Sequence, residues 1–406
     1  MERPGYLVDY LYERFPTQPC KVMARGERFF FLPGGRCRIE PDLRMRPVRD
    51  ARTGNENATR EPHTSIVPKS RKVSGMSDSV EAASVAGAFA TIGEILVDFT
   101  PLVDRGATVG FRMHPGGSPR NVAVGLARCG ARVEFVGAVS TDFFGRFLVA
   151  QLEREGVGTR LLVRSAAPST LAFVATERDG PSFTFYRTGA ADTQLATADV
   201  PPAVDESDVL HFGSISLLTA STRETVLALA DRLHGRRLLS FDPNIRPSLI
   251  DDPDGYRRMF ARAARAADVV KLSEADLAWW MPGVAVAEGA DRLRALGPAL
   301  VVVTLGGRGC YARAPRREMR VPAPQVEVVD TIGAGDAFSS GLLLRLWERG
   351  LGSRRALERA DAETLEDALR FAAAAAALAC TKAGADPPRR DEIEQLLGPG
   401  VGHAAH

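Results

Sequence analysis

The chain has 406 residues, of which 45% are hydrophobic and 25% are charged, and its formal net charge is +2 at pH 7. This is the usage of a globular protein with a large apolar core, and it gives no signal for binding nucleic acid or a membrane. Five scattered cysteines without a CxxC pair argue against a disulfide framework or a zinc site and predict a cytoplasmic protein. No apolar run is long enough to span a bilayer.

Residues 1–85 do not match the rest of the chain. They are rich in Arg and Pro and mostly lack apolar periodicity, which is typical of an irregular, disordered extension; only RFFFLPGGRCRIE, residues 28–40, could form a short hairpin. Two interpretations are open: a genuine extension with a regulatory or targeting role, or a misplaced start upstream of Met76. We favour the second, because a recognisable domain begins soon after Met76.

Between residues 86 and 398, short apolar runs alternate with helical patterns, and a tail of residues 399–406 follows. The runs FATIGEILVDF, VEFVGAVS, DVLHFGSIS, RLLSFDPNIR, DVVKLSE and LVVVTLGG read as strands, and several are almost continuously hydrophobic, as in parallel sheets buried on both faces. Helical segments such as SPRNVAVGLARCG and TRETVLALADRLHG lie between them. The alternation predicts one α/β domain with a mainly parallel sheet.

The segment 160–187 departs from this alternation. It contains β-rich runs around a DG turn, with no helix between them. We expect antiparallel strands set apart from the main sheet, forming a small lid whose strands lie mainly within residues 108–118 and 160–190.

The stretch VEVVDTIGAGDAFSSGLLLRLWERG, residues 326–350, reads as a strand end, a loop and a helix. Gly333 and Gly335 let a ligand approach the backbone closely, and the free N–H groups of the first helical turn, with the helix dipole, form a site for an anion such as phosphate. Asp336 stands at the helix entrance, where the dipole should keep it ionised and able to deprotonate a hydroxyl. From the residues alone, a plain turn followed by an ordinary helix residue is an equally good interpretation.

Two motifs carry a family resemblance. The segments GGSPRNVAVGLARCGARVEFVGAVSTDFFG (116–145) and VDTIGAGDAFSSGLL (329–343) resemble the two signatures of the ribokinase/PfkB family of sugar kinases. The resemblance covers roughly residues 89–398. It implies a ribokinase-like three-layer α/β sandwich with a mainly parallel central sheet and a small β-rich lid. It also implies ATP-dependent phosphorylation of a sugar hydroxyl, with Mg²⁺.

The resemblance assigns roles to residues of both motifs. Asp336 matches the family's catalytic base, which also touches the sugar. The anion hole that stabilises the transferring phosphate is matched by Gly333, Ala334 and Gly335. The residues that match the sugar-binding positions are Asp98, Gly116, Gly117 and Asn121.

Further along the chain, the resemblance implies a nucleotide site. KLSE at 271–274 matches the family's NxxE motif, whose glutamate, here Glu274, organises the water shell of Mg²⁺. Lys271 stands where that motif has asparagine, and it could contact a phosphate directly. TLGGRG at 304–309 resembles the nucleotide-binding strand and turn, which places Thr304, Gly306 and Gly309 near the ribose and phosphates.

The resemblance also implies a site for a monovalent cation, K⁺ as an activator. The ligands would be Asp330 and backbone oxygens of Ile332, Ala379, Lys382 and Gly384. Pro388 stands where some members have a serine ligand, which is a departure from the pattern. The alanine-rich helix before this loop is expected to end at Gly384. Its small side chains suit close packing against adenine, although such a helix more often only packs against other helices.

Three segments resemble those of fructokinases: HFGSISL (211–217), FYRTGAAD (185–192) and FDPNIRPSL (241–249). Arg187 is expected to reach down from the lid, and Asn244 and Arg246 to lie near the sugar or the phosphates. Fructose is the favoured substrate, and 2-keto-3-deoxygluconate, ribose and related sugars remain open, because a few pocket residues decide between them.

Two other classes of function were weighed. A catalytically silent, regulatory protein with a kinase fold would be expected to lose Asp336 or its glycine loop, and both are intact. A nicotinamide-dependent Rossmann enzyme needs a glycine fingerprint after the first strand, and GEILVDFTP is not one. The histidines carry little weight: His211 is expected to be structural, and His114, next to the diglycine loop, could touch the substrate, although this is the less favoured interpretation. A homodimer through the lid strands is the one protein partner that the resemblance suggests.

Overall fold

The computed structural model describes residues 21–24, 27–32, 36–41, 85–177 and 180–398. The chain divides into two compact units, and each is described by itself. One comprises residues 1–81 together with 101–111, and the other comprises residues 82–100 together with 112–406.

The first unit contains a small sheet formed by β1 (Lys21–Ala24), β2 (Glu27–Leu32) and β3 (Arg36–Pro41). β2 and β3 pair antiparallel, with Phe29 opposite Ile39, which confirms the hairpin expected within residues 28–40. β1 lies before this hairpin and was not expected from the sequence. The predictions about Met76, the rest of the extension and the tail 399–406 fall outside the described residues.

The second unit is built around a large sheet. Among the described residues this sheet has nine strands, in the order β16 (Arg317–Val321), β15 (Cys310–Ala314), β14 (Leu300–Thr304), β13 (Val269–Ser273), β12 (Leu238–Asp242), β11 (Val209–Gly213), β4 (Val85–Ile92), β7 (Ala131–Ser140) and β8 (Leu162–Ser165). The strands from β14 to β8 of that order run parallel, and only β15 and β16 pair antiparallel.

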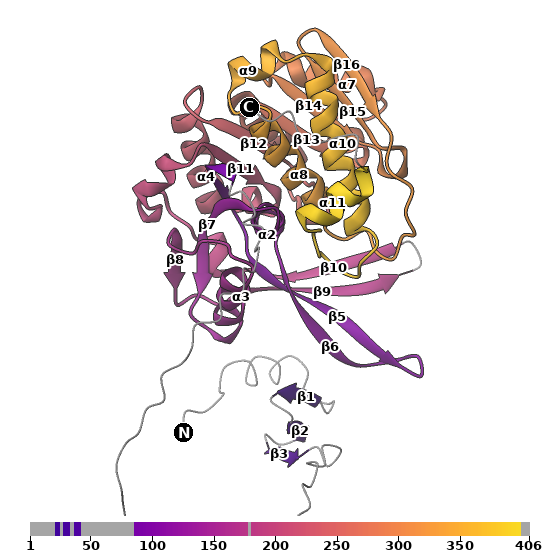
Figure 1. Cartoon of the computed structure of the whole chain (residues 1–406). Coiled ribbons are helices and arrows are strands. Elements are labelled where there is room, and N and C mark those ends of the chain that lie inside the picture. The colour runs from indigo at the N-terminus through magenta and orange to yellow at the C-terminus, as the bar shows by residue number, and fades with distance from the viewer. Residues whose placement is uncertain (1–20, 25–26, 33–35, 42–84, 178–179, 399–406) are drawn as a thin grey trace, which may run out of the picture. The chain divides into compact units, whose positions relative to one another are not determined.

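Helices cover both faces of this sheet (Figure 1). One face packs on α2 (Ser118–Arg128), α3 (Phe143–Arg154), α8 (Ala334–Glu348), α10 (Ala362–Ala379) and α11 (Arg390–Leu397). The other face packs on α4 (Ala220–Leu233), α5 (Pro253–Ala266), α6 (Glu274–Trp280) and α7 (Val286–Ala295). The short helix α9 (Arg354–Arg359) joins α8 to α10.

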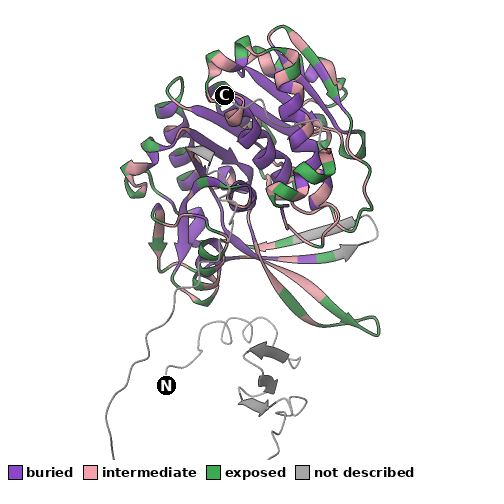
Figure 2. Cartoon of the chain, viewed as in Figure 1, coloured by how far each residue is buried: buried purple, intermediate pink, exposed green. Residues whose placement is uncertain are grey.

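Side chains alternate between the two cores, as the two-residue period of a strand requires. On β12, Leu238 belongs to the core under α8, whereas Leu239 and Phe241 belong to the core under α4 and α5. The central strands are buried almost throughout their length (Figure 2). The predicted three-layer α/β architecture with a mainly parallel sheet is therefore confirmed. No helix in the described part of the chain is both long enough and apolar enough to cross a bilayer.

A second, four-stranded sheet has the order β10 (Gly180–Tyr186), β9 (Thr170–Glu177), β5 (Leu96–Asp104) and β6 (Ala107–Gly116). It corresponds to the expected lid, with two corrections. FATIGEILVDF is not one strand, because the chain turns at Gly93 (φ +153°), so β4 stays in the central sheet and β5 enters the lid. β8, within the segment expected to be lid, instead extends the central sheet by pairing parallel with β7.

The alanine-rich helix α10 ends at Ala379 rather than at Gly384, where the sequence predicted its end. The chain turns earlier because the carbonyl of Cys380 accepts hydrogen bonds from the backbone N–H groups of Val329 and Asp330, at 2.8 and 3.2 Å. Gly384 still adopts a left-handed conformation (φ +75°), but it does so in the loop that follows the helix. This loop therefore lies against the segment that leads into α8.

Candidate active site

Polar side chains gather at the edge of the central sheet where the parallel strands end, which is where open α/β sheets bind ligands. Glu94 follows β4, Ser214 follows β11, and β12 ends in Asp242. α8 packs against this edge, and the hydroxyl of its Ser339 donates to Asp242 Oδ2 at 3.4 Å. The start of α8, which carries Asp336, is thereby placed over the strand ends.

Asp336 is the third residue of α8, after a left-handed N-cap at Gly333 (φ +77°). Its carboxylate is buried and accepts hydrogen bonds from Ser118 Oγ at 2.6 Å and from Asn121 Nδ2 at 2.9 Å. Burial raises the pKa of Asp336 to about 6, and the two hydrogen bonds oppose that rise. Burial outweighs the helix dipole that was expected to hold the proton affinity down, yet the carboxylate is still mostly ionised at pH 7.

The predicted sugar-binding residues Asp98, Gly116 and Gly117 lie together at the base of the lid. A Cβ atom on Gly116 would lie 2.1 Å from Asp98 Oδ2, and one on Gly117 (φ +107°) would lie 2.5 Å from the carbonyl oxygen of Glu94. Gly117 therefore tolerates only glycine, whereas a side chain at Gly116 would displace the carboxylate of Asp98. Burial raises the pKa of Asp98 to about 7, against the opposing charges of Arg120 and Arg246.

Three residues of this region were missed in the sequence. Ser118 Oγ donates to Asp336 Oδ1, and Arg120 Nη1 donates to Asn121 Oδ1 at 3.1 Å. Both residues stand inside the GGSPRN motif, which was the signal available in the sequence. The carboxylate of Glu94 is fully buried and accepts the backbone N–H groups of Ser118 and Ser216, both at 3.1 Å. Burial raises its pKa to about 7.

Arg187, Asn244 and Arg246 converge on the same side of the site. Arg187 follows β10, and its Nη2 donates to the carbonyl of Ile215 at 3.0 Å. Arg246 Nη1 donates to Asn244 Oδ1 at 2.8 Å, and Asn244 itself adopts a left-handed conformation (φ +39°). The charge of Arg246 lowers the pKa of Asp98, so the predicted sugar contacts share one electrostatic environment.

Lys271 forms a buried ion pair. Its Nζ lies 2.8 Å from Asp242 Oδ2, and the side chains are only 6% and 2% exposed. A Cβ atom on Gly335 would lie 2.8 Å from the same Nζ, so this ammonium group sits beneath the predicted anion hole. Asp242 was not predicted, although an acid that ends a buried parallel strand was a usable signal.

The predicted nucleotide residues come from two neighbouring strands. Thr304 ends β14 and is followed by the turn η6 (Gly306–Arg308) and by Gly309 in a left-handed conformation (φ +90°). Glu274 opens α6 after β13, and its carboxylate pairs with Arg308. The two motifs therefore meet through this ion pair, at an exposed part of the sheet edge.

The residues predicted to hold a monovalent cation are brought together. Asp330 Oδ1 accepts the N–H of Ile332 at 3.0 Å, and Asp330 Oδ2 accepts the N–H of Gly384 at 2.8 Å. The N–H of Lys382 donates to the carbonyl of Ala379 at 3.3 Å, in the turn that ends α10. These oxygen-rich loops suit a hard cation. No cluster of three or more His, Cys, Asp or Glu side chains suited to a metal is found within the described ranges.

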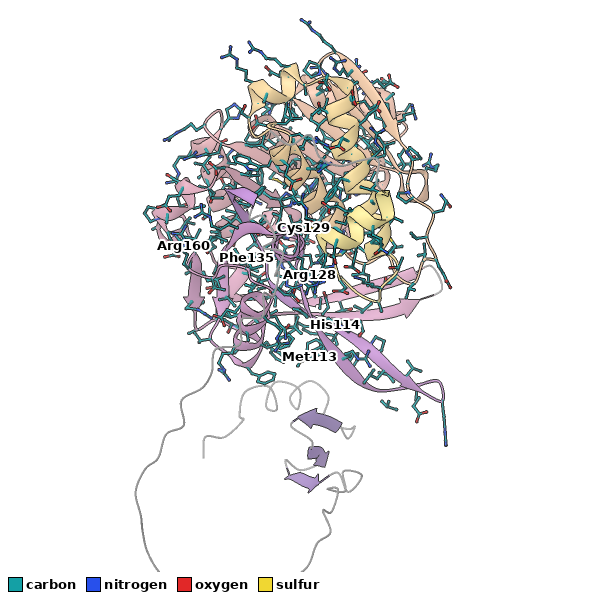
Figure 3. All side chains as sticks on the ribbon, viewed as in Figure 1. Met113, His114, Arg128, Cys129, Phe135 and Arg160 are labelled. Carbon is teal, nitrogen blue, oxygen red and sulfur yellow. The ribbon has the colours of Figure 1, made fainter. Side chains whose placement is uncertain are left out.

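The two histidines differ in setting. His114, on β6, lies with its Nε2 3.1 Å from Thr100 Oγ1, and burial lowers its pKa (Figure 3). A Cβ atom on Gly384 would be 4.0 Å from its Nδ1, so His114 faces the loop after α10. His211 is buried in the sheet beside Ser240, and burial lowers its pKa to about 3. A permanently neutral, buried imidazole is consistent with the structural role that was expected.

Comparison with known proteins identifies the family. The pattern of the pfkB family carbohydrate kinase matches residues 88–392. Fructokinase-1 from Oryza sativa subsp. japonica is 37% identical over 315 residues, which are 75% of this chain and 95% of that protein. A solved structure of fructokinase with bound ATP from Xylella fastidiosa has a TM-score of 0.70 at 32% identity, and the match covers 76% of this chain and 98% of that one.

A second solved structure, a fructokinase from Vibrio cholerae O395 in a fructose-, ADP- and potassium-bound form, has a TM-score of 0.68 at 29% identity. That match covers 78% of this chain and all of the other, 100%. The resemblance inferred from the two motifs is thereby confirmed, together with the ribokinase-like fold that it implied. The chain belongs to the PfkB family of carbohydrate kinases.

Proposed function

We propose that this kinase is an ATP-dependent fructokinase, which converts D-fructose and ATP to fructose 6-phosphate and ADP. The observation that carries the proposal is the position of Asp336. Its buried carboxylate stands at the start of α8 and is held by Ser118 and Asn121 of the diglycine segment. The relatives named fructokinase, and the fructose- and ADP-bound neighbour, support fructose as the sugar.

Asp336 is the general base of the proposed reaction. The sugar hydroxyl gives its proton to the carboxylate while its oxygen bonds to the γ-phosphorus, and the bond from that phosphorus to the bridging oxygen of ADP breaks. A pKa of about 6 suits this task, because the group is ionised at neutral pH but still accepts a proton readily. Asp98, Asn121, Arg187 and Arg246 position the sugar.

The backbone N–H groups of Gly333, Ala334 and Gly335 are the proposed anion hole, and Lys271 adds a positive charge from below. Thr304, Gly306 and Gly309 hold the nucleotide. Mg²⁺, when bound, supplies charge neutralisation between the phosphates. The carboxylate of Glu274 is 46% exposed, which leaves room for a contact through the water shell of that ion.

The loops around Asp330 are the proposed site of an activating K⁺. Asp330 and the carbonyl oxygens of Ile332, Ala379, Lys382 and Gly384 would hold it, and the potassium-bound neighbour supports this choice of ion. Since Asp330 already joins the segment before α8 to the loop after α10, a cation there would fix the anion hole. Free thiols at Cys129, Cys310 and Cys380 suit the reducing cytoplasm as its location.

The test is an ATP-consumption screen over fructose, 2-keto-3-deoxygluconate, ribose and related sugars, with and without K⁺. We expect fructose to be the best substrate, and Asp336→Asn to abolish turnover while ATP binding and folding persist. If another sugar is turned over and fructose is not, the assignment of fructose as the substrate is wrong, whereas the proposed mechanism still holds. Full activity of Asp336→Asn would contradict the assignment of Asp336 as the general base.

A homodimer through the lid strands is part of the proposal. Three apolar side chains at the outer end of the β5–β6 hairpin are exposed: Leu102 is 41%, Val103 63% and Val109 55% accessible. Apolar side chains clustered on an exposed hairpin are typical of a protein–protein contact.

A further inference from the structure

Arg120 is a buried arginine whose position has three energetic costs. It is only 3% exposed, and it stands in the first turn of α2, where the helix dipole disfavours a positive charge. Its hydrogen bonds in the described part of the chain go to neutral oxygens, those of Pro115 at 3.4 Å and Asn121 at 3.1 Å. Its Nε is buried and has no partner among the residues that the structure describes. A charge held at such cost calls for a role that offsets it.

The contacts of Asn121 indicate that role. Its side-chain amide has one accepting end and one donating end, and the two ends face different partners. The guanidinium of Arg120 can only donate, so it requires Asn121 Oδ1 on its side. The carboxylate of Asp336, when ionised, can only accept, so it requires Nδ2 on the other side. Both neighbours therefore fix the same orientation of the amide.

We propose that Arg120 is a positioning residue, which holds the Asn121 amide so that its Nδ2 donates to the base Asp336. The proposal rests on the proposed function, because it takes Asp336 to be the base. Without Arg120 only Asp336 orients the amide, so the amide is held less firmly and also samples the orientation, half a turn away, in which its oxygen faces the carboxylate. The two oxygens would repel each other, and the base would keep only the hydrogen bond from Ser118.

Other charges also act on Asp336, and the test must separate them from the amide. Asp242 on β12 and Asp98 on β5 raise its proton affinity, whereas Lys271 on β13 lowers it. Arg120 itself is stabilised by the charges of Glu155, Asp98 and Asp336, and it is opposed by that of Arg128. Removing Arg120 could therefore alter the base directly, through its charge, or indirectly, through Asn121. A double-mutant cycle distinguishes the two routes.

The experiment measures the pH profile of kcat/KM for fructose, at a saturating concentration of ATP. The variants are Arg120→Met, Asn121→Ala and the double variant. Losing one hydrogen bond to a charged group should move the acid limb of the profile up by about one pH unit. We expect this shift in each single variant, and no further shift when Arg120→Met is added to Asn121→Ala. Arg120→Lys, which keeps a donor, should restore much of the wild-type profile.

Several outcomes would overturn the inference. Shifts that add in the double variant would show that Arg120 acts through its charge alone. A uniform fall in kcat with an unmoved acid limb in Arg120→Met would show a merely structural role, and so would an Arg120→Lys variant whose acid limb moves as far as that of Arg120→Met. Ser118→Ala is the control: it removes the other donor to Asp336 and should also move the limb up. If Ser118→Ala leaves the limb in place and Asp336→Asn stays active, the proposed base has failed rather than the role of Arg120.

Discussion

The carboxyl groups of three residues, Glu94, Asp98 and Asp336, have pKa values above their ordinary ones. Burial is the largest cause in each. Between the pKa of the unfolded chain and the raised pKa of the folded chain, the native state binds more protons than the unfolded state. Their contribution to stability is therefore greatest at low pH and falls as pH rises toward 7.

Glu94 offers the clearest test of this pH dependence. Glu94→Gln keeps the shape of the side chain but removes its titration, at the loss of one accepted hydrogen bond. We expect the free energy of unfolding of the wild type, relative to this variant, to fall by about 2 kcal/mol between pH 5 and pH 8. Urea unfolding at each pH measures it. A difference that stays constant across this range would contradict the raised pKa.

The Lys271–Asp242 pair is a second residue-scale feature with a measurable consequence. Lys271→Met would leave the carboxylate of Asp242 buried and unpaired, and should destabilise the protein by about 3–5 kcal/mol. Adding Asp242→Asn should recover part of the loss. The exposed pair of Arg292 and Glu288 is the control, because Arg292→Ala should cost about 0.5 kcal/mol or less. Equal losses at the two sites, measured by urea unfolding, would show that burial gives the first pair no special weight.

At the scale of elements, the start of α8 depends on its contact with the loop after α10. Gly333 is left-handed, and a Cβ atom there would lie 2.8 Å from the Cα of Ala385. Gly333→Ala should therefore displace the amides of the anion hole and lower kcat about 100-fold. Gly130→Ala is a matched control, because Gly130 is also left-handed (φ +87°) but faces open space.

Both glycine variants should lose about 1–2 kcal/mol through backbone strain, and Gly333→Ala should lose more in unfolding measurements because its Cβ also meets Ala385. Steady-state kinetics should then separate them, since only Gly333→Ala disturbs the site. If Gly130→Ala lowers kcat as far, backbone strain rather than displacement of the anion hole explains the loss.

The elements of the central sheet were largely predictable, because each buried strand is a local apolar run bounded by turns. The divisions between sheets were not. Nothing in FATIGEILVDF shows that the chain turns at Gly93 and leaves one sheet for another, since both halves are equally apolar. β8 was placed in the lid for the same reason: pattern fixes a strand, but its partner is decided by packing far along the chain.

The candidate site was predictable where its residues are contiguous, as in the loop that leads into Asp336. It was not predictable where a side chain acquires its role from a distant partner. Ser118 meets Asp336 across 218 residues of chain, and Lys271 meets Asp242 across 29. The sequence predicted that the helix dipole would dominate the pKa of Asp336, whereas burial does. Burial comes from surrounding elements, and it cannot be predicted from the start of the helix alone.

At the scale of the whole molecule, the proposed dimer predicts a change of mass. Val103→Asp with Val109→Asp places charges on the exposed hairpin and should convert a dimer to a monomer in analytical ultracentrifugation. Leu396→Asp, at an exposed position of α11, is the control and should leave the mass unchanged. If the wild type sediments as a monomer at all concentrations, the proposed dimer is wrong.

The two hydrogen bonds of Glu94 have a thermodynamic consequence for the molecule as a whole. One carboxylate oxygen holds the start of α2, which carries the donors to Asp336, and the other holds Ser216, next to the carbonyl that receives Arg187. The side chain of Glu94 thus joins the segment that donates to Asp336 to the segment that accepts the hydrogen bond of Arg187. Since any coupling between two sites is reciprocal, we expect a change that strengthens the contact of Arg187 to alter the proton affinity of Asp336 by the same free energy.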